Sequence, residues 1–414
     1  MIRILHIVTY MGRGGLETML MNYDRFMDRE KVQFDFLEHR SFETNYDREI
    51  RKLGGRIWHV SRRCPWSIAY RQELKRFFRE HSEYQIIHVH LDCFSAVVLK
   101  CAKDAGVPVR IAHSHSAGAR KDLKYLLRLY CKRRIPEYAT DLLACGTAAG
   151  DWMFSGHAYG IMPNAIDLEL FHYCKAEAQK IRQELHLEGC KVLGHVGRFH
   201  PAKNHGFLIK VFEEVRKREP NARLLLVGDG EGREKIVRNV WKAGLENEVV
   251  FTGNRPDVYR LLQGMDLMVF PSLYEGFPVT IVEAQATGLP CLMSDRISPE
   301  CILEEELVEV CSLEESPEKW AEHILKVLDC SLEQPEKRPD WEGQKERKKK
   351  QGTAGKHMHR KLQQPDTGFR KRRREWSSFI RNTGRWKLML RSVMIWQKRV
   401  WKIYFHRYLC CREN

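Results

Sequence analysis

The sequence of 414 residues lacks any apolar run of about 18 residues or more, the length that a membrane-spanning helix needs. The apolar run at its start is short and ends in glycines without a small-residue cleavage pattern, which argues against a signal peptide. Its 13 cysteines form no Cys-x-x-Cys pair and are scattered through strand-like and helix-like segments. These absences argue against a membrane-spanning protein and against a disulfide framework, so we expect a cytoplasmic protein with reduced thiols.

Most of the chain lacks an excess of either charge, although the net charge of the whole sequence is +16. Residues 330–414 carry 24 Lys+Arg and 8 Asp+Glu, so the whole excess lies in this segment and residues 1–329 are neutral. The same segment holds five of the ten tryptophans. It is a basic, Trp-rich tail, and its abrupt change of composition indicates that it is disordered or not native to the fold.

Two series of short apolar runs alternate with helical patterns along residues 1–329. Runs of this kind are typical of parallel strands that are buried on both faces, with helices between them. The sequence therefore predicts two doubly wound, Rossmann-like α/β domains, residues 1–168 and 169–329, with the ligand in the cleft beyond the carboxyl ends of their strands. The expected strands are residues 2–10, 32–39, 85–90, 107–115 and 141–146 in the first domain, and 191–199, 222–228, 248–253, 266–271 and 290–295 in the second.

The stretch "YEGFPVTIVEAQATGLP", residues 274–290, places a Gly-Phe-Pro corner after a buried strand. We expect a helix to begin just after Glu275, so that its free N–H groups face an oxygen-rich ligand. Glu275 and Glu283 would then accept hydrogen bonds from hydroxyl groups, and Gly276 would allow the backbone to come close to the ligand. The alternative is that both carboxylates are ordinary surface groups.

A glycine pair follows the first expected strand of the first domain, and two cations lie at the end of the first expected strand of the second domain and just after it. Arg198 and Lys203 in "GRFHPAKN" could neutralise a diphosphate, and Gly14 and Gly15 could bring backbone amides close to a phosphate. The chain has no Asp-x-Asp pair that would hold a divalent metal on the diphosphate, so fixed cations would have to stabilise that charge. Solvated basic residues and a flexible, ligand-free loop are the alternatives.

Histidines recur at the ends of two expected strands, in "IIHVH" and "IAHSH". Alternate residues of a strand share a face, so His113 and His115 could both point into the cleft and orient an acceptor hydroxyl or stabilise charge. No Cys or Glu at ligand spacing completes a convincing zinc set with them, so we expect no metal site.

Six motifs in order resemble the retaining GT-B glycosyltransferases of family 4: "RGGLE", "PNAID", "GRFHPAKN", "LLLVGDGE", "FTGNRPDV" and "EGFPVTIVEAQATGLP". The resemblance covers roughly residues 1–329 and is nearest to bacterial enzymes of capsular and exopolysaccharide synthesis. It implies a GT-B fold and a metal-independent enzyme without a resident cofactor. The donor implied is a nucleotide sugar, commonly a UDP-sugar, that transfers a hexose with retention of anomeric configuration.

The resemblance also implies roles for particular residues. Arg198 and Lys203 would hold the diphosphate, and Glu283 would hold the ribose. The remaining implied contacts are those of the backbone near Arg255 and Val258 with the base, of Glu275 and the amides of Gly276 and Phe277 with the donor sugar, and of Gly14 and Gly15 with the phosphate.

The acceptor is expected on the first domain. Residues 118–134, "GARKDLKYLLRLYCKRR", predict an apolar and basic helix beside His113 and His115. Such a helix suits a saccharide or lipid-linked acceptor at an anionic membrane, and would place the enzyme at the inner face of the plasma membrane. An ordinary solvated helix is the alternative.

Two rival functions remain open from the sequence. Another GT-B enzyme, such as a UDP-sugar epimerase, would use the same donor without an acceptor. A nucleic-acid-binding protein would act through the basic tail, where Trp and Tyr alternate with cations, although the neutral body makes nucleic acid an unexpected partner.

Overall fold

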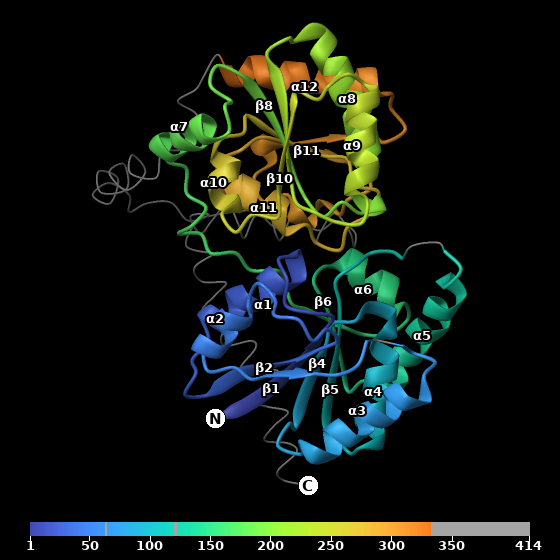
Figure 1. The fold of residues 1–414 in the computed structure, drawn as a ribbon. Helices are drawn as coiled ribbons and strands as arrows, with labels where there is room; N and C mark the ends of the chain where they lie inside the picture. The colour runs from blue at the N-terminus through green and yellow to red at the C-terminus, as the bar shows by residue number, and fades with distance from the viewer. Residues whose placement is uncertain (63, 120–121, 333–414) are drawn as a thin grey trace, which may run out of the picture. The chain divides into compact units, whose positions relative to one another are not determined.

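The computed structural model describes residues 1–62, 64–119 and 122–332, which lie within one compact unit (Figure 1). The basic tail predicted for residues 330–414 falls almost wholly outside the described residues, so its prediction is not taken further. The described residues contain two parallel sheets, and helices connect their strands. No helix in these residues is long and apolar enough to cross a membrane.

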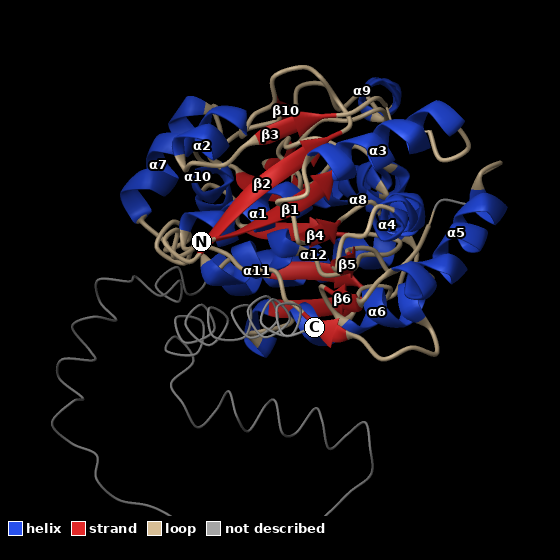
Figure 2. Cartoon of the chain, turned by 90° about the horizontal axis from the view of Figure 1, so that it is seen from below, coloured by secondary structure: helices blue, strands red, loops and turns tan. Residues whose placement is uncertain are grey.

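The first sheet has the strand order β3-β2-β1-β4-β5-β6-β7, and its neighbouring strands pair in parallel. Figure 2 looks along it and shows α1 and α2 on one side of its strands and α3, α4 and α5 on the other. Its strands are β1 (Ile2–Val8), β2 (Val32–Glu38), β3 (Ile57–His59), β4 (Ile86–Val89), β5 (Val109–Ser114), β6 (Asp141–Ala144) and β7 (Gly160–Ile161). Its helices are α1 (Gly15–Arg25), α2 (Asp47–Lys52), α3 (Ile68–Glu80), α4 (Ser95–Asp104), α5 (Tyr125–Tyr138) and α6 (Thr147–Phe154), with the 3-10 turn η1 (Asp92–Phe94).

The second sheet has the strand order β10-β9-β8-β11-β12-β13 and is parallel as well. Its strands are β8 (Lys191–Val196), β9 (Ala222–Val227), β10 (Val249–Gly253), β11 (Leu267–Phe270), β12 (Cys291–Ser294) and β13 (Val308–Cys311). The helices are α7 (Lys175–Glu184), α8 (His205–Arg218), α9 (Arg233–Lys242), α10 (Val258–Gln263), α11 (Val279–Ala286) and α12 (Pro317–Leu332), with the turns η2 (Pro201–Lys203), η3 (Pro299–Cys301) and η4 (Glu305–Leu307).

Each sheet owes its parallel form to strands that are apolar on both faces. In β1 and β8 nearly every residue is buried, and helices cover both sides, as expected for crossover connections. The predicted fold class, two doubly wound α/β domains, is confirmed. The domain limits at residues 168 and 329 stay a prediction, although β7 ends the first sheet at Ile161 and β8 begins the second at Lys191.

The strand order of both sheets reverses direction next to the first strand. In the first sheet β1 lies between β2 and β4, and in the second β8 lies between β9 and β11. At such a switch point the loops after the two central strands run to opposite faces and leave a crevice, where ligands of open α/β sheets bind. The residues that follow β1, β4, β8 and β11 are therefore the first place to look for chemistry.

The helix predicted over residues 118–134 starts later than expected. The structure begins α5 at Tyr125, because the Asp122 side chain accepts a hydrogen bond from the Lys124 N–H at 2.9 Å and binds the guanidinium of Arg128 at 2.7 Å. This local turn fixes the first helical residue. The prediction of a helix from residue 118 was wrong in its first turns, whereas its second half is confirmed.

Candidate functional site

An ion pair occupies the switch point of the second sheet. Lys203 lies in η2, after β8, and its Nζ is 2.7 Å from Oε1 of Glu275, which follows β11. Both side chains are largely buried, and the ammonium also lies 4.6 Å from the centre of the Phe270 ring. A backbone hydrogen bond of 2.7 Å from Leu273 N–H to the Ala202 carbonyl joins the two loops. The structure thus brings together two residues that are 72 positions apart in sequence and that the sequence analysis had selected separately.

The loop carrying Arg198 is held by the neighbouring loop after β9. Phe199 N–H donates to the Asp229 carbonyl at 3.0 Å, and Gly230 has a φ of 156°, in the region that favours glycine. A Cβ on Gly230 would lie 2.9 Å from the backbone N and O of Phe199, so the packing requires a glycine here. The motif "GDGE" therefore supports the backbone on either side of Arg198, whose own side chain is exposed.

Glu17, in the first turn of α1, interacts electrostatically with Arg198. Burial raises the pKa of the Glu17 carboxyl to about 7, and the positive charge of Arg198 opposes that rise. Glu17 was not singled out from the sequence, although "RGGLE" contains it. The signal that could have found it is a carboxylate in the first turn of a helix that starts at a glycine pair after a switch-point strand.

The N-termini of two helices approach each other beside these charges. Gly14 is the residue before α1, and both it and Gly15 are exposed. A Cβ on Gly15 would be 3.9 Å from a methyl carbon of Val279, the first residue of α11. The first turns of α1 and α11 therefore present free N–H groups and the positive ends of their dipoles to the same region, an arrangement suited to an anion.

Helix α11 begins at Val279, which is later than the predicted start just after Glu275. Pro278 precedes it with φ −72° and ψ 104°, an extended conformation that a helix cannot contain. The residues at 276 and 277 therefore belong to the loop. The Gly-Phe-Pro corner is a linker between Glu275, which pairs with Lys203, and the first residue of α11.

That corner packs tightly on the first domain. A Cβ on Gly276 would overlap the carbonyl oxygen of His115, and the Phe277 carbonyl accepts a hydrogen bond of 2.9 Å from the Asn164 side chain. The Phe277 ring packs against the core of the first sheet. Asn164 comes from the "PNAID" motif, so that motif positions the corner as well as linking the domains. The assignment of the Gly276 and Phe277 amides to a donor sugar stays a prediction.

Glu283 lies within α11 and is 6% exposed. Its carboxyl group has no hydrogen-bond or ion-pair partner among the described residues, and burial raises its pKa to about 7. Because burial without a hydrogen-bond partner is unfavourable for a carboxyl group, Glu283 is open to a ligand that donates hydrogen bonds to it. The alternative of an ordinary surface carboxylate does not fit this burial.

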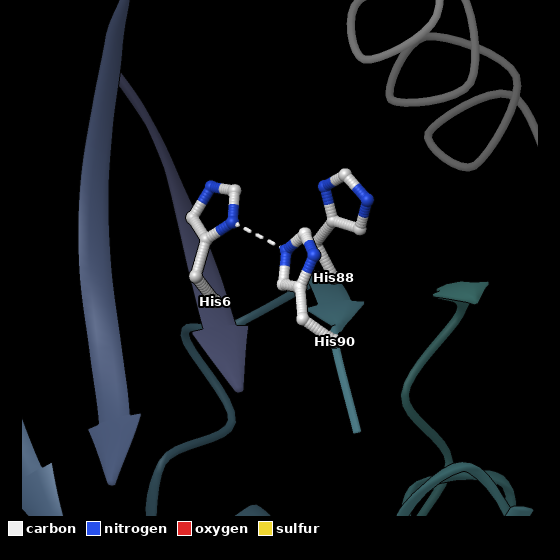
Figure 3. A group of neighbouring side chains, drawn as sticks. All are labelled: His6, His88 and His90. Carbon is white, nitrogen blue, oxygen red and sulfur yellow. Dashed lines mark hydrogen bonds between the residues drawn. The ribbon is translucent and has the colours of Figure 1, made fainter. Parts of the chain in front are cut away.

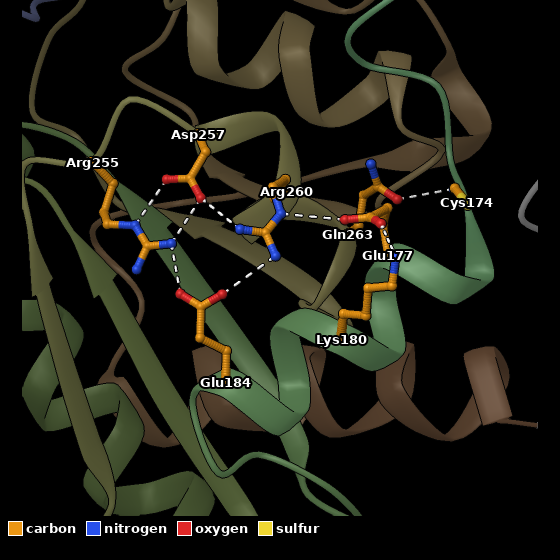
Figure 4. A network of polar contacts seen from close by, with 8 residues as sticks. All are labelled: Cys174, Glu177, Lys180, Glu184, Arg255, Asp257, Arg260 and Gln263. Atoms are coloured by element: carbon orange, nitrogen blue, oxygen red, sulfur yellow. Dashed lines mark hydrogen bonds and ion pairs between the residues drawn. The ribbon is translucent and has the colours of Figure 1, made fainter.

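The side chain of Arg255 belongs to a polar network between α7 and α10 (Figure 4). Its guanidinium contacts Asp257 at 2.7 Å and Glu184 at 2.8 Å, and the hydrogen bond to Arg255 is the main reason that the pKa of Asp257 falls to about 2. Arg260 joins the same two carboxylates. Because this side chain has a structural role, only the backbone between Arg255 and Val258, the first residue of α10, is available for the base contact that was predicted.

The two histidines selected as catalytic candidates have different surroundings. Their rings contact each other at a centroid distance of 4.0 Å, tilted by 35°, so His113 and His115 share a face of the sheet. His113 is 1% exposed, and its Nδ1 lies 3.1 Å from Nε2 of His88, whereas His115 is only partly buried and lies at the loop that contacts Gly276. This geometry favours His115 for any contact with a substrate.

Both halves of the chain match known protein families. Residues 177–348 match the family described as glycosyl transferases group 1, and residues 13–170 match glycosyltransferase family 4. The protein named glycosyltransferase EpsF, from Bacillus subtilis (strain 168), is 37% identical over 336 residues, covering 78% of this chain and 87% of that protein. This chain belongs to the family 4 glycosyltransferases. The predicted family is thereby confirmed, and the enzyme is a nucleotide-sugar-dependent glycosyltransferase.

Other relatives of this family 4 glycosyltransferase extend the comparison. An Escherichia coli protein named UDP-Gal:alpha-D-GlcNAc-diphosphoundecaprenol alpha-1,3-galactosyltransferase is 27% identical, with 54% of this chain and 61% of that protein covered. Anabaena HepE, solved with UDP and glucose, has a TM-score of 0.66 at 19% identity, with 82% and 92% of the chains covered. WaaG, described as a glycosyltransferase of lipopolysaccharide biosynthesis, has a TM-score of 0.62 at 16% identity, with 79% and 90% covered. These structures confirm the GT-B fold.

Proposed function

We propose that this glycosyltransferase moves a hexose from a UDP-sugar to a hydroxyl of a saccharide or lipid-linked acceptor, with retention, in the assembly of a surface polysaccharide. The observation that carries the proposal is the Lys203–Glu275 ion pair at the switch point of the second sheet, beside Arg198 and the first turns of α1 and α11. Cations and helix N-termini suit a diphosphate, and carboxylates suit sugar hydroxyls.

The chemical step needs stabilisation of the charge that develops on the departing diphosphate. The acceptor oxygen bonds to the anomeric carbon, the bond from that carbon to the diphosphate oxygen breaks, and the acceptor proton leaves with the released UDP. Arg198 and Lys203 act as fixed cations for that charge, so a divalent metal is not needed on the diphosphate. Glu275 and Glu283 hold hydroxyl groups and do not serve as the acid and base pair of a glycoside hydrolase.

The choice of UDP and of a lipid-linked acceptor is supported by relatives. HepE was solved with UDP-glucose, and the name of the Escherichia coli relative gives UDP-galactose as donor and a diphosphoundecaprenol sugar as acceptor. The buried carboxyl of Glu283 has the chemistry that a ribose diol requires. His115 directly follows the carboxyl end of β5, beside Gly276, and we assign it to the acceptor side, with His113 behind it.

Helix α5 and the residues just before it, where we expect the acceptor, carry exposed apolar residues beside basic ones. Leu126 and Tyr130 of α5 are 78% and 63% exposed, and Leu123 is fully exposed just before this helix. The ammonium of Lys124 lies 5.2 Å from the ring of Trp66, which is itself more than half exposed. Apolar side chains flanked by cations are typical of peripheral binding to an anionic membrane, which supports the proposed location at the inner face of the plasma membrane.

The test is transfer by the full chain with a panel of UDP- and GDP-sugars, each with and without a diphosphoundecaprenol-linked N-acetylhexosamine acceptor. We expect a product that carries the donor sugar with its anomeric configuration retained, together with one UDP released per transfer. Conversion of a UDP-sugar to its epimer without acceptor would favour the rival UDP-sugar epimerase. Turnover with GDP-sugars alone would contradict the donor assignment.

A further inference from the structure

Five histidines, on or directly after three neighbouring strands, form one cluster in the first sheet, with four of them buried and His115 partly buried. His6 comes from β1 and is in register with His88 of β4, and the sheet order then places β5 beside β4. Figure 3 shows three of the five rings, with the contact between His6 and His90 dashed. The cluster consists of His6, His88, His90, His113 and His115.

The rings contact one another through their nitrogens. Nδ1 of His90 is 2.9 Å from Nε2 of His115, while its Nε2 is 3.1 Å from Nδ1 of His6. Nδ1 of His113 is 3.1 Å from Nε2 of His88. The remaining ring nitrogen of His113, Nε2, is buried without a partner among the described residues. A nitrogen buried without a partner is unfavourable, so the cluster calls for a ligand.

We propose that His90, His113 and His115 bind one divalent transition-metal ion, with zinc as the first candidate. Ligand atoms of these three residues lie within 4.8 Å of one another. The structure assigns Nδ1 of His90, Nε2 of His113 and Nε2 of His115 as the ligands. Three histidines around zinc leave a fourth position for water or another oxygen ligand, and the partly buried His115 provides the route of entry.

The other two histidines complete the arrangement. A metal-binding histidine normally uses its second ring nitrogen for a hydrogen bond that fixes the ring and its tautomer. His90 has this contact to His6, and His113 has it to His88. The spacing also fits, because two nitrogens bound to zinc at tetrahedral angles lie about 3.3 Å apart, close to the 2.9 Å between His90 and His115.

This inference revises the expectation of no metal site. Sequence spacing showed two His-x-His pairs and no third ligand, because a pair on one strand cannot reveal what the neighbouring strand presents. It shares His113 and His115 with the acceptor side of the proposed glycosyl transfer, but its test measures the binding of an ion and does not depend on transfer activity.

A second possible set, Cys311, Glu315 and His323, lies at the far edge of the second sheet. Its members already contact one another or Glu309, with Nδ1 of His323 at 2.5 Å from Glu309 and the Cys311 thiol at 3.6 Å from Glu315. It has no buried nitrogen without a partner, so it does not carry the proposal. Because this second set contains the Cys311 thiol, the experiment must distinguish a metal site with a thiolate ligand from a site with nitrogen ligands alone.

The experiment measures zinc bound to the full chain by mass spectrometry of the metal after equilibration and removal of loose ions. All zinc measurements use a background protein with Cys311→Ser, His357→Ala and His359→Ala, so that these side chains cannot contribute to zinc binding. We expect about one equivalent of zinc, and a cobalt-loaded form with tetrahedral absorption bands but no thiolate charge-transfer band. Zinc should also raise the Tm of the protein.

Variants assign the ligands. His90→Gln and His115→Gln should each lower zinc affinity by at least tenfold, and His6→Gln, which loses only an outer hydrogen bond, should lower it less. The matched control is His39→Gln, because His39 is buried with both nitrogens bonded, to the Val8 carbonyl and to the Tyr70 hydroxyl. Circular dichroism of each variant checks that it folds.

The proposal is overturned if the background protein, with all five cluster histidines intact, binds no zinc or if its cobalt form shows a thiolate band in place of the nitrogen spectrum. It is equally overturned if His90→Gln and His115→Gln bind zinc as the background does. If His6→Gln loses the ion and His115→Gln retains it, the ion lies deeper in the sheet, and His115 is not a ligand.

Discussion

Glu275 and Glu283 are eight positions apart in sequence but differ in what surrounds their carboxyl groups. Glu275 is paired with Lys203, whereas Glu283 is buried without a partner among the described residues. We expect Glu275→Ala and Glu283→Ala each to lower kcat/KM for the UDP-sugar at least tenfold while circular dichroism stays unchanged. The matched control is Glu246→Ala, at an exposed loop position of the same domain. Full transfer activity in both variants would refute these roles.

Glu283 also has a pH-dependent effect on stability. Its pKa is raised from 4.5 to about 7 in the folded protein, so the folded state holds this proton more tightly than the unfolded state between those pH values. The contribution is therefore unfavourable above pH 7 and disappears towards pH 4.5, on the order of 3 kcal/mol at most.

Glu283→Gln replaces that carboxyl with a neutral group of similar shape. We expect its Tm in the absence of donor to exceed that of the wild type at pH 8 and to equal it near pH 4.5, while UDP-sugar affinity falls. Thermal unfolding of both proteins across this pH range measures the difference. A variant less stable than the wild type at pH 8 would indicate that Glu283 is a structural residue with a partner.

Arg198 differs from Lys203 in being exposed. Arg198→Ala should therefore leave the Tm within about 1 °C, because exposed substitutions change stability little, but should weaken UDP binding at least tenfold. Arg238→Ala, at an exposed position of α9, is the control for a general loss of positive charge. Equal UDP affinity in the two variants, measured by calorimetry, would remove Arg198 from the diphosphate site.

Single residues were predictable where a motif placed them after a central strand. Arg198, Lys203 and Glu275 follow β8 and β11, and the structure brings the last two into contact. Glu17 and His6 were missed, because their partners, Arg198 and His90, come from segments that only the folded sheets bring close. Local sequence carries no record of such contacts.

At the scale of elements, the corner between β11 and α11 depends on a residue without a side chain. A Cβ on Gly276 would overlap the carbonyl oxygen of His115, so Gly276→Ala must displace this corner from the first domain. We expect a loss of transfer activity of at least tenfold. Gly206→Ala in α8 is the control, since its Cβ would meet only Asn239 at 3.9 Å. Activity of Gly276→Ala equal to that of the control would show that the close approach has no functional consequence.

Long, strongly apolar strands and amphipathic helices could be predicted, whereas the short strands β3, β7 and β13 could not. β3 and β7 have three and two residues and lie at the two edges of the first sheet, where burial is incomplete. β13, at the other sheet's edge, is partly exposed as well. The late starts of α5 and α11 depend on the hydrogen bond that the Asp122 side chain accepts from the Lys124 N–H and on the extended backbone of Pro278, and hydrophobic periodicity reports neither.

At the scale of the whole molecule, the account places membrane contact on α5 and the residues just before it. Leu126→Glu together with Tyr130→Glu should reduce flotation of the full chain with anionic liposomes at low salt, because charge replaces apolar surface. Val237→Glu with Trp241→Glu, exposed apolar positions on α9, is the matched control. Unchanged flotation of the α5 variant would contradict this docking face.

We propose that one UDP-sugar site lies at the switch point of the second sheet and uses Lys203, Glu275 and Glu283. Calorimetric titration of UDP into the wild type and into Lys203→Met and Glu283→Ala measures the affinity of this site. We expect the wild type to bind one UDP per chain, and each variant to bind it at least tenfold more weakly. Equal UDP affinity in all three proteins, or no UDP binding by a folded wild type, would contradict it.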